Sequence, residues 1–355
     1  MRRAVHTVLA ILAAASLAAS TAAGPFGTPD GSRHELHPSE QTRVVAVGDV
    51  HGAFENFTAV LKKAGLIDEQ HRWAGGKAVL VQTGDVADRG EGMRASLDLL
   101  MSLEQQASRA GGRVHPLLGN HEVMHLVGET RDATPEIFAS FGGELEMREA
   151  FGPRGRYGRW LRSKAAIAEV DDSVFLHGGI NPDFSNASTG EINRRARREL
   201  AQWDEGVKWL VSRKLVSPSP KFLEAVDAAR KELERLSAPE LRDQPETPGT
   251  AALLIPIAEI GTSSLFSPEG PLWFRGFSTW SDEEGDARIT AVLAKLRAKR
   301  LVTGHTVTET RRITERFGGR LFLIDTGMLG GKFFPSGRAS ALEIVAGTAR
   351  PVYLD

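Results

Sequence analysis

The chain has 355 residues, of which 41% are hydrophobic and 25% are charged, so it resembles an ordinary globular protein that can bury a substantial core. Its formal net charge is −1, which provides no global field for nucleic acid or an anionic membrane surface, and no nucleic-acid partner is expected. The chain has no cysteine, which excludes disulfides, thiolate metal sites and cysteine nucleophiles. Any metal site must therefore use oxygen and nitrogen ligands.

Residues 1–23 have the pattern of a secretory signal peptide. Two arginines precede an apolar stretch, Val8–Ala19, and small residues follow as far as Ala23, after which we expect cleavage. The apolar stretch is shorter than the roughly 20 residues that a membrane-spanning helix needs, so no stable membrane span is expected after cleavage; an uncleaved anchor is the alternative. We therefore expect a secreted protein, located in the bacterial periplasm, with an extended lead at 24–42 and a folded domain at 43–355.

Strands and helices alternate in the first third of the folded domain. Short β-branched runs predict strands at Arg43–Val47, Lys77–Thr83 and Val114–Leu118, and apolar spacing predicts helices at Phe54–Ala64 and Gly92–Arg109. This order implies parallel strands with right-handed crossovers. Their carboxyl ends then lie on one edge of a sheet, where open α/β sheets place their sites.

The rest of the chain contains an insertion and a carboxy-terminal region rich in predicted strands. We expect charged helices at 190–240, a loop at 243–270 and a helix at Ala287–Lys299, with residues 182–270 forming a helical and loop insertion. The further strands that we expect are Ala165–Val170, Ser173–Leu176, Leu301–Thr303, Leu321–Asp325, Ala341–Val345 and Pro351–Leu354. A basic run at 194–198 is flanked by Glu191 and Glu199, so we interpret it as a solvated helix face rather than an anion-binding patch.

Five short polar segments containing glycine follow these apolar runs: Gly48–Gly52, Gly84–Gly90, Gly119–Glu122, His177–Gly179 and Gly304–His305. They supply six side chains of the kinds that bind divalent cations: Asp49, His51, Asp85, Asn120, His177 and His305. A lone Asp-x-His is weak evidence. Six suitable side chains at the ends of apolar runs are a far more specific signal, and they predict a metal centre.

The ligands divide between two divalent cations. Asp49 and His51 are two residues apart, so on an extended chain both side chains point the same way and can bind one ion. The Asp85 carboxylate can give one oxygen to each ion, and Asn120 with two histidines, His177 and His305, completes the second. Oxygen and imidazole ligands suit Mn²⁺, which we expect, with Fe or Zn as alternatives. Pairs of metals about 3.5–4 Å apart promote in-line attack on phosphorus.

This set of motifs resembles the calcineurin-like metallophosphoesterase superfamily, and the fuller segments Gly84–Gly90 and Gly119–Glu122 resemble its phosphoprotein phosphatase branch. Two later segments, Gly270–Gly276 and Ile324–Met328, are similar to the Shewanella-like bacterial phosphatases. The similarity spans Val44 to Leu342. It implies an α/β fold, a two-sheet β-sandwich flanked by helices with a helical cap insertion, and the same six metal ligands.

Four further residues are candidates for catalysis. Arg89 follows the bridging motif, and a guanidinium holds two phosphate oxygens at once. Arg275 is the second candidate for phosphate contact, because the Trp280-Ser281-Asp282 stretch lacks the proline found in the Ser/Thr phosphatases. The resemblance implies that His121 protonates the leaving group and that Asp88 orients it. Glu122 either supports the ligands or caps a helix, whereas His125 and His115 are expected to be structural or solvated.

The sequence therefore predicts a secreted, dinuclear metal-dependent phosphatase that hydrolyses phosphomonoesters by direct attack of a metal-bridging hydroxide. Its expected partner is a phosphorylated protein, including phosphotyrosine substrates, or a small phosphate ester. One alternative is a dinucleoside polyphosphate hydrolase or phosphodiesterase, although such relatives usually have His-Ala-Gly where this chain has His177-Gly178-Gly179. The other is a non-catalytic metal- or phosphate-binding protein.

Overall fold

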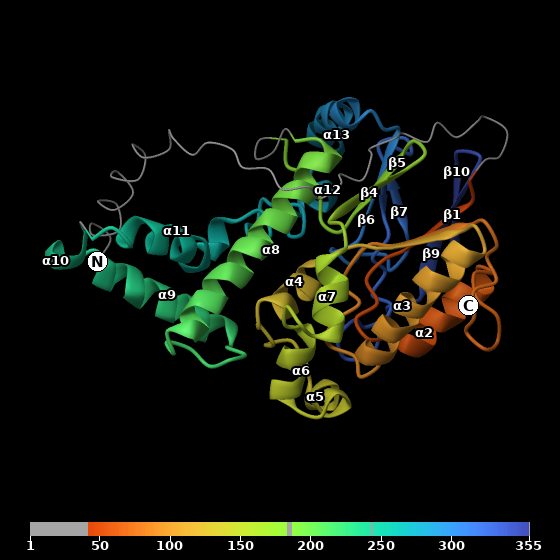
Figure 1. Ribbon diagram of the computed structural model, residues 1–355. Coiled ribbons are helices and arrows are strands. Elements are labelled where there is room, and N and C mark those ends of the chain that lie inside the picture. The colour runs from red at the N-terminus through yellow and green to blue at the C-terminus, as the bar shows by residue number, and fades with distance from the viewer. Residues whose placement is uncertain (1–41, 183–186, 243, 355) are drawn as a thin grey trace.

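The computed structural model describes residues 42–182, 187–242 and 244–354. The predicted signal peptide and all but the last residue of the predicted lead lie outside the described residues. The described chain forms two five-stranded sheets that pack face to face with helices outside them (Figure 1). This is the two-sheet sandwich that the sequence predicts.

The first sheet carries the amino-terminal half of the site. Its strand order is β10-β9-β1-β2-β3. The central strands β1 (Val44–Val47), β2 (Val79–Gln82) and β3 (Arg113–Pro116) are parallel, as predicted, and antiparallel β9 (Ser340–Val345) and β10 (Thr348–Tyr353) complete the edge. Helices α2 (Phe54–Lys63) and α3 (Met93–Arg109) form the crossovers between the parallel strands.

The second sheet carries the carboxy-terminal half of the site. Its order is β4-β5-β6-β8-β7, with β4 (Ile167–Val170), β5 (Ser173–Leu176), β6 (Arg300–Thr303), β7 (Thr314–Arg316) and β8 (Leu321–Leu323). The strands predicted at 165–170 and 173–176 are confirmed as β4 and β5, which pair antiparallel. Strand β7 was not predicted.

The two sheets are joined by an apolar layer between their inner faces. On β1, Val44 and Ala46 contact side chains of the opposite sheet, including Phe175 and Phe322, whereas Val45 faces the helix-covered side. Successive strand residues point to opposite faces, so a strand buried on both faces needs an uninterrupted apolar run. This requirement explains why the β1 sequence is Val-Val-Ala-Val.

The chain between β3 and β4 folds into four short helices for which the sequence analysis made no prediction. They are α4 (Asn120–Leu126), α5 (Pro135–Phe141), α6 (Glu144–Phe151) and α7 (Arg156–Arg162). Helix α4 begins immediately after the third polar motif, so it carries three motif residues into one buried turn. Helices α6 and α7 pack beside it, and α5 packs on α6 and α3.

The insertion is more helical than expected. Helices α8 (Thr189–Ser212), α9 (Phe222–Leu236), α10 (Pro239–Arg242) and α11 (Thr247–Ala258) extend away from the sandwich (Figure 1). The predicted loop at 243–270 is therefore wrong over α11 and a short 3₁₀ turn, η1 (Ile260–Thr262). Prolines occur in the first turn and inside α11, yet its apolar residues pack on α8 and α9, which outweighs the proline signal.

Two further helices, α12 (Gly276–Thr279) and α13 (Asp282–Leu296), return the chain to β6. Helix α13 covers the region where Ala287–Lys299 was predicted to be helical. Across the described residues, no helix combines the length and the apolar character needed to cross a membrane.

Candidate metal centre

All six predicted ligands lie at one end of the sandwich. Each one follows a strand: Asp49 and His51 follow β1, Asp85 follows β2, Asn120 follows β3, His177 follows β5 and His305 follows β6. Carboxyl ends of parallel strands meet at the same sheet edge, and here the two sheets present their edges side by side. The exposed fraction of these six side chains does not exceed 7%.

The backbone at the site is held in an uncommon conformation. His51, Asp85, Asp88, Arg89 and His305 all have positive φ angles, between 45° and 69°. A non-glycine residue in this region is uncommon and is retained where the surrounding contacts impose it. The concentration of five such residues in the motif segments indicates that side-chain placement at the site takes precedence over local backbone preference.

Two glycines allow the motif backbones to touch. Gly84 has φ of 95°, and a Cβ there would lie 2.5 Å from the nitrogen of Gly119. A Cβ on Gly119 would in turn collide with Asp85 and Glu122. These positions accept no side chain, so the glycines in the motifs set how closely the second and third segments approach.

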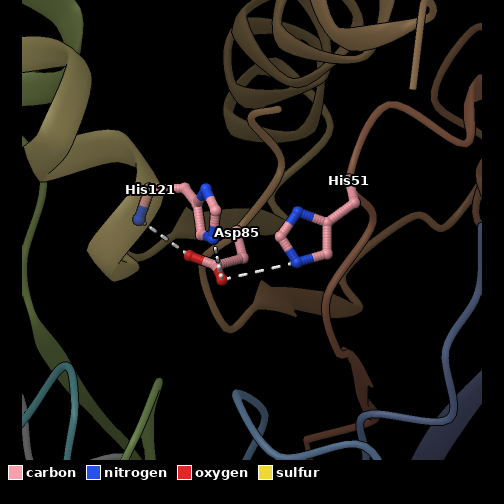
Figure 2. A group of neighbouring side chains, drawn as sticks. All are labelled: His51, Asp85 and His121. Atoms are coloured by element: carbon pink, nitrogen blue, oxygen red, sulfur yellow. Dashed lines mark hydrogen bonds and ion pairs between the residues drawn. The ribbon is translucent and has the colours of Figure 1, made fainter. Parts of the chain in front are cut away.

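The first group of potential ligand atoms comes from His51, Asp85 and His121 (Figure 2). The Nε2 atom of His51 lies 3.5 Å from Oδ2 of Asp85 and 3.9 Å from Oδ2 of Asp49. The Nε2 atom of His121 lies 3.8 Å from the same Asp85 oxygen. His121 therefore reaches a position next to the first predicted ion, although the sequence analysis assigned it only to proton transfer.

The second group comes from Asp85, His177 and His305. The Nε2 atom of His177 lies 3.3 Å from Oδ2 of Asp85, 2.9 Å from Oδ1 of Asn120 and 3.0 Å from Nδ1 of His305. Four potential ligand atoms thus converge on one point. Asp85 belongs to both groups.

Backbone carbonyls orient the three imidazoles. Nδ1 of His51 contacts the Ala87 carbonyl at 2.8 Å, and Nδ1 of His177 contacts the Thr83 carbonyl at 3.0 Å. Nε2 of His305 contacts the Trp273 carbonyl at 3.1 Å. A carbonyl accepts only from a protonated nitrogen, so these contacts assign the tautomers and turn the other nitrogen of each ring inward as a lone pair.

This arrangement fits a bound cation. Nε2 of His177 and Nδ1 of His305 face each other at 3.0 Å, and by the tautomer assignment both are acceptors, joined by the oxygens of Asp85 and Asn120. Buried acceptors that face one another are stabilised by a cation between them. The donor set of imidazole nitrogens with carboxylate and amide oxygens suits Mn, Fe or Zn ions rather than Ca²⁺.

Burial also keeps the imidazoles able to bind metal. Burial lowers the pKa of His51 to about 3, and burial together with the neighbouring His177 and Arg275 lowers the pKa of His305. Neutral imidazole is the form that ligates metals. In contrast, burial and the nearby carboxylates of Asp325 and Asp85 raise the pKa of Asp49, so cationic charge is needed to keep these carboxylates ionised together.

Glu122 supports the loop that carries Asp85. Its carboxylate accepts hydrogen bonds from the backbone N–H groups of Asp85, Val86, Ala87 and Gly119, at 2.7 to 3.0 Å. The side chain is 1% exposed. Glu122 thus fixes the second motif against the third, and through the Gly119 N–H it also caps α4, so both roles that the sequence left open are observed.

The predicted pair of His121 and Asp88 is in contact. Nδ1 of His121 donates to Oδ2 of Asp88 at 2.6 Å. Burial lowers the pKa of His121, but the carboxylates of Asp85 and Asp88 outweigh it and raise the pKa to about 9. The other Asp88 oxygen accepts from Nε2 of His125 at 2.8 Å. His125, expected to be structural or solvated, thus shares the Asp88 carboxylate with His121.

The two arginines occupy different positions. Arg89 lies against the first group, with Nη1 2.8 Å from Nε2 of His51 and Nη2 3.4 Å from Nε2 of His121. Its guanidinium carbon lies 5.0 Å from the centroid of the Phe334 ring. Arg275 lies beside the second group, where Nη1 donates to the His305 carbonyl at 3.0 Å and to Thr306 Oγ1 at 2.9 Å.

Two residues near the site escaped the sequence analysis. His125 follows His121 by four residues, a spacing that places both on one face of a helix, and this was the available signal. Phe334 stacks on His51 with ring centroids 5.7 Å apart, but it lies in a glycine-rich loop far along the chain and has no local signal. Asp325, whose charge contributes to the raised pKa of Asp49, is 1% exposed and accepts a hydrogen bond from the Gly327 N–H at 2.9 Å.

Comparison with known proteins places the chain in one family. The calcineurin-like phosphoesterase family model matches residues 42–309. An uncharacterized protein of Schizosaccharomyces pombe, C1840.07c, is 31% identical over 294 residues, which cover 81% of this chain and 73% of that protein. Shewanella-like protein phosphatase 1 of Plasmodium berghei is 26% identical over 292 residues, covering 81% of this chain and 67% of that protein.

Solved structures agree with this placement. The cold-active protein-tyrosine phosphatase of a psychrophilic Shewanella species matches with a TM-score of 0.59 and 26% identity, covering 87% of this chain and 80% of that chain. The motifs, the sandwich and His/Asp groups that could bind divalent metals occur together in this protein. The chain belongs to the calcineurin-like phosphoesterase family, in the neighbourhood of the Shewanella-like protein phosphatases, and is a metal-dependent phosphoester hydrolase.

Proposed function

We propose that the protein is a secreted phosphatase that hydrolyses phosphomonoesters with two divalent cations held side by side. The observation that carries this proposal is the position of Asp85, whose carboxylate contributes to both groups of ligand atoms. A carboxylate shared in this way suits two adjacent cations. Asp49, His51 and Asp85 would hold one ion, and Asp85, Asn120, His177 and His305 would hold the other.

The remaining residues handle the phosphate and the proton. When bound, the cations supply an activated water and the positive charge that phosphoryl transfer requires. Arg89 and Arg275 lie beside the two groups and would bind the non-bridging phosphate oxygens. His121 would donate its proton to the leaving oxygen as the P–O bond breaks, since Asp88 holds its Nδ1 and leaves Nε2 directed toward the ligand groups.

We propose a phosphorylated protein, with phosphotyrosine included, as the substrate. The relatives named as protein phosphatases, one of them a protein-tyrosine phosphatase, support this proposal. The Trp-Ser-Asp stretch also has a structural role here: Ser281 Oγ accepts from the Glu284 N–H at 3.1 Å, and Asp282 pairs with Arg316 at 2.8 Å. Arg275, rather than a residue of that stretch, is therefore the better partner for phosphate.

The insertion would act as a cap that shapes the substrate site. A chain of contacts supports this. Glu199 of α8 accepts from the Ser264 hydroxyl at 2.7 Å, Trp273 Nε1 donates to the Leu265 carbonyl at 2.8 Å, and the Trp273 carbonyl accepts from His305 at 3.1 Å. Helix α8 is thus connected to a metal ligand through few intermediates. Trimming α9 to α11 should alter substrate preference and leave metal content intact.

Secretion remains a proposal that rests on residues 1–23 alone. Expression of the full chain in a bacterium, followed by fractionation and mass spectrometry of the amino terminus, tests it. Cleavage after Ala23 and recovery in the periplasmic fraction are expected. Recovery of an uncleaved chain in the membrane fraction would contradict cleavage.

Activity is tested with p-nitrophenyl phosphate and its bis-ester. Purified mature protein should hydrolyse the monoester with Mn²⁺, lose activity with a chelator, and act poorly on the bis-ester. A preference for the bis-ester or for dinucleoside polyphosphates would favour the diesterase alternative. Absence of turnover of every ester, in protein that contains two metals per chain, would favour the non-catalytic alternative.

A further inference from the structure

Helix α8 presents four arginines on one exposed face. Arg194, Arg195, Arg197 and Arg198 are all exposed, while Ile192, Ala196 and Leu200 of the same helix are buried. Helical periodicity explains the division, because the buried residues lie four apart and leave the remaining positions to the opposite side. These four residues are called the arginine face below.

The glutamates that flank the arginine face are bound elsewhere. Glu191 accepts from the N–H and the hydroxyl of Ser188, both at 2.7 Å, and so caps the start of α8. Glu199 points inward, where it accepts from the Ser264 hydroxyl at 2.7 Å and from the backbone N–H groups of Ser264 and Leu265. The arginines therefore form an exposed helix face, as the sequence predicts, but the two flanking glutamates make their hydrogen bonds elsewhere.

Over the described part of the chain, no carboxylate oxygen lies within 4.0 Å of the guanidinium of Arg194, Arg195, Arg197 or Arg198. Arg194 lies near Glu191, but it lowers the pKa of that carboxyl less than the Ser188 hydrogen bonds do. The arginine face thus keeps most of its positive charge on a protein whose net charge is −1.

One residue of the arginine face, Arg195, lies beside the segment that follows β5. Arg195 lines a small cavity together with Gly179 and Ile180, and Gly179 is two residues from the ligand His177. The acidic residue in this cavity, Glu269, accepts a hydrogen bond from Asn181 at 2.6 Å. The cavity therefore places Arg195 beside the segment that carries His177.

We propose that the arginine face binds an acidic segment of a protein substrate while the phosphorylated residue occupies the metal centre. This inference rests on the proposed phosphatase function and names its substrate class. The four arginines span about 6 Å of the helix axis, at 1.5 Å per residue, which matches about two residues of extended chain. Guanidinium groups bind carboxylates in bidentate fashion, so a few glutamates or aspartates near the phosphoresidue fit this length.

The small size of the arginine face favours a short acidic peptide segment over a long polyanion such as a nucleic acid. A nucleic acid needs basic residues along an extended track of phosphates, whereas these arginines occupy little more than one turn of one helix. Peptide docking next to the metal centre also raises the local concentration of the phosphorylated residue. The expected signature is therefore a lower KM for acidic phosphopeptides with kcat little changed.

The test compares two phosphotyrosyl peptides that differ only in four flanking residues, all Glu in one and all Gln in the other. The wild-type protein should hydrolyse the Glu peptide with kcat/KM about tenfold higher at low salt, and the ratio should fall as salt rises. The variant R194Q/R195Q/R197Q/R198Q should bring the ratio close to one. Anisotropy of the labelled Glu peptide measures docking without turnover and should show the same loss.

A matched variant controls for total charge. R109Q/R113Q/R297Q/R350Q also removes four exposed arginines, from the ends of α3 and α13 and from β3 and β10. It gives the same net charge as the first variant, so it should keep the preference for the Glu peptide. Equal loss in both variants, or no preference in the wild type, would overturn the proposal.

Further measurements distinguish failure of the peptide-docking proposal from failure of the proposed phosphatase function. Turnover of p-nitrophenyl phosphate should be the same in the wild type and both variants, and its absence in metal-loaded wild type would refute the phosphatase function instead. Tighter binding of single-stranded DNA than of the Glu peptide, lost only in the arginine-face variant, would assign the face to nucleic acid and overturn the peptide proposal.

Discussion

Nε2 of His125 donates a hydrogen bond to Oδ1 of Asp88 at 2.8 Å, on the opposite side of the carboxylate from His121. Asp88 is fully buried, so its two oxygens depend on these two imidazoles for hydrogen bonds. His125 itself is 2% exposed and packs against Phe151. It therefore fixes the carboxylate that orients His121, the proposed proton donor.

Replacement of His125 by leucine should lower kcat for p-nitrophenyl phosphate by on the order of tenfold with little change in KM. The variant leaves one Asp88 oxygen without a donor, and the carboxylate then no longer holds His121 in one orientation. His125→Gln should recover part of the loss, because its amide N–H reaches a similar position. His115→Leu, a histidine on β3 away from the motifs, serves as the control; equal kcat in all variants would contradict the role.

The placement of the six ligands could be predicted from the sequence because each follows a strand whose end meets the same edge. Parallel strands joined by right-handed crossovers have their carboxyl ends at the same sheet edge. The strand order alone therefore predicts that Asp49, Asp85 and Asn120 lie together at that edge. His177 and His305 come from the second sheet, and their position depends on how two sheets pack. For His177 and His305, the prediction of a place at the site came from their glycine-flanked motifs rather than from hydrophobic periodicity.

Helix α11 and the contact between His125 and Asp88 are two features that local sequence patterns could not predict. The prolines near α11 indicate a loop by local chemistry, yet the apolar surfaces of α8 and α9 stabilise a helix there, and that information is not local. His125 had a spacing signal, but an i and i+4 pair of histidines on a helix is compatible with either contact or exposure. Only the buried position of Asp88 between them decides it.

Replacement of Glu122 by glutamine should destabilise the protein by about 3 kcal/mol. One carboxylate oxygen becomes an amide that cannot accept from the buried N–H groups of the Asp85 loop. Urea unfolding of the metal-free protein measures the effect. Glu104→Gln should cost under about 1 kcal/mol, because the Glu104 side chain is 34% exposed and its hydrogen bonds to Trp160 and Lys164 are only partly buried. Similar losses in both variants would argue against a special role for Glu122.

Gly84→Ala and Gly119→Ala should reduce metal content and activity together. An added Cβ at either position meets backbone or carboxylate atoms of the neighbouring motif, which forces apart the segments that carry Asp85 and Asn120. Gly249→Ala is the control, since a Cβ there meets nothing within 4 Å and alanine favours helix. Full metal loading of Gly119→Ala by elemental analysis would show that the close approach is not required.

Asp85→Asn should lose both ions, whereas His51→Ala should retain about one ion per chain, because only Asp85 belongs to both ligand groups. Elemental analysis of purified variants gives the stoichiometry. Asp282→Asn, a surface variant, should match the wild type in metal content, and one retained ion in Asp85→Asn would contradict a shared ligand.

Chelation of the wild type should lower Tm by about 5–10 °C, with recovery on addition of Mn²⁺.

Phe334 holds Arg89 in place from the far side of the site. Its ring stacks on His51 and lies under the Arg89 guanidinium, whose carbon is 5.0 Å from the ring centroid. A cation–π contact of this kind contributes about 0.5–1 kcal/mol, so Phe334→Leu, which keeps apolar bulk, should raise KM for a phosphomonoester about two- to fivefold. The neighbouring Phe333→Leu should leave KM unchanged, since Phe333 is 38% exposed and its ring is contacted by Lys332.

A double variant tests whether Phe334 acts through Arg89. If Arg89 binds phosphate, Phe334→Leu combined with Arg89→Ala should have the same KM as Arg89→Ala alone. A further rise in KM would show that the Phe334 ring contacts the substrate itself.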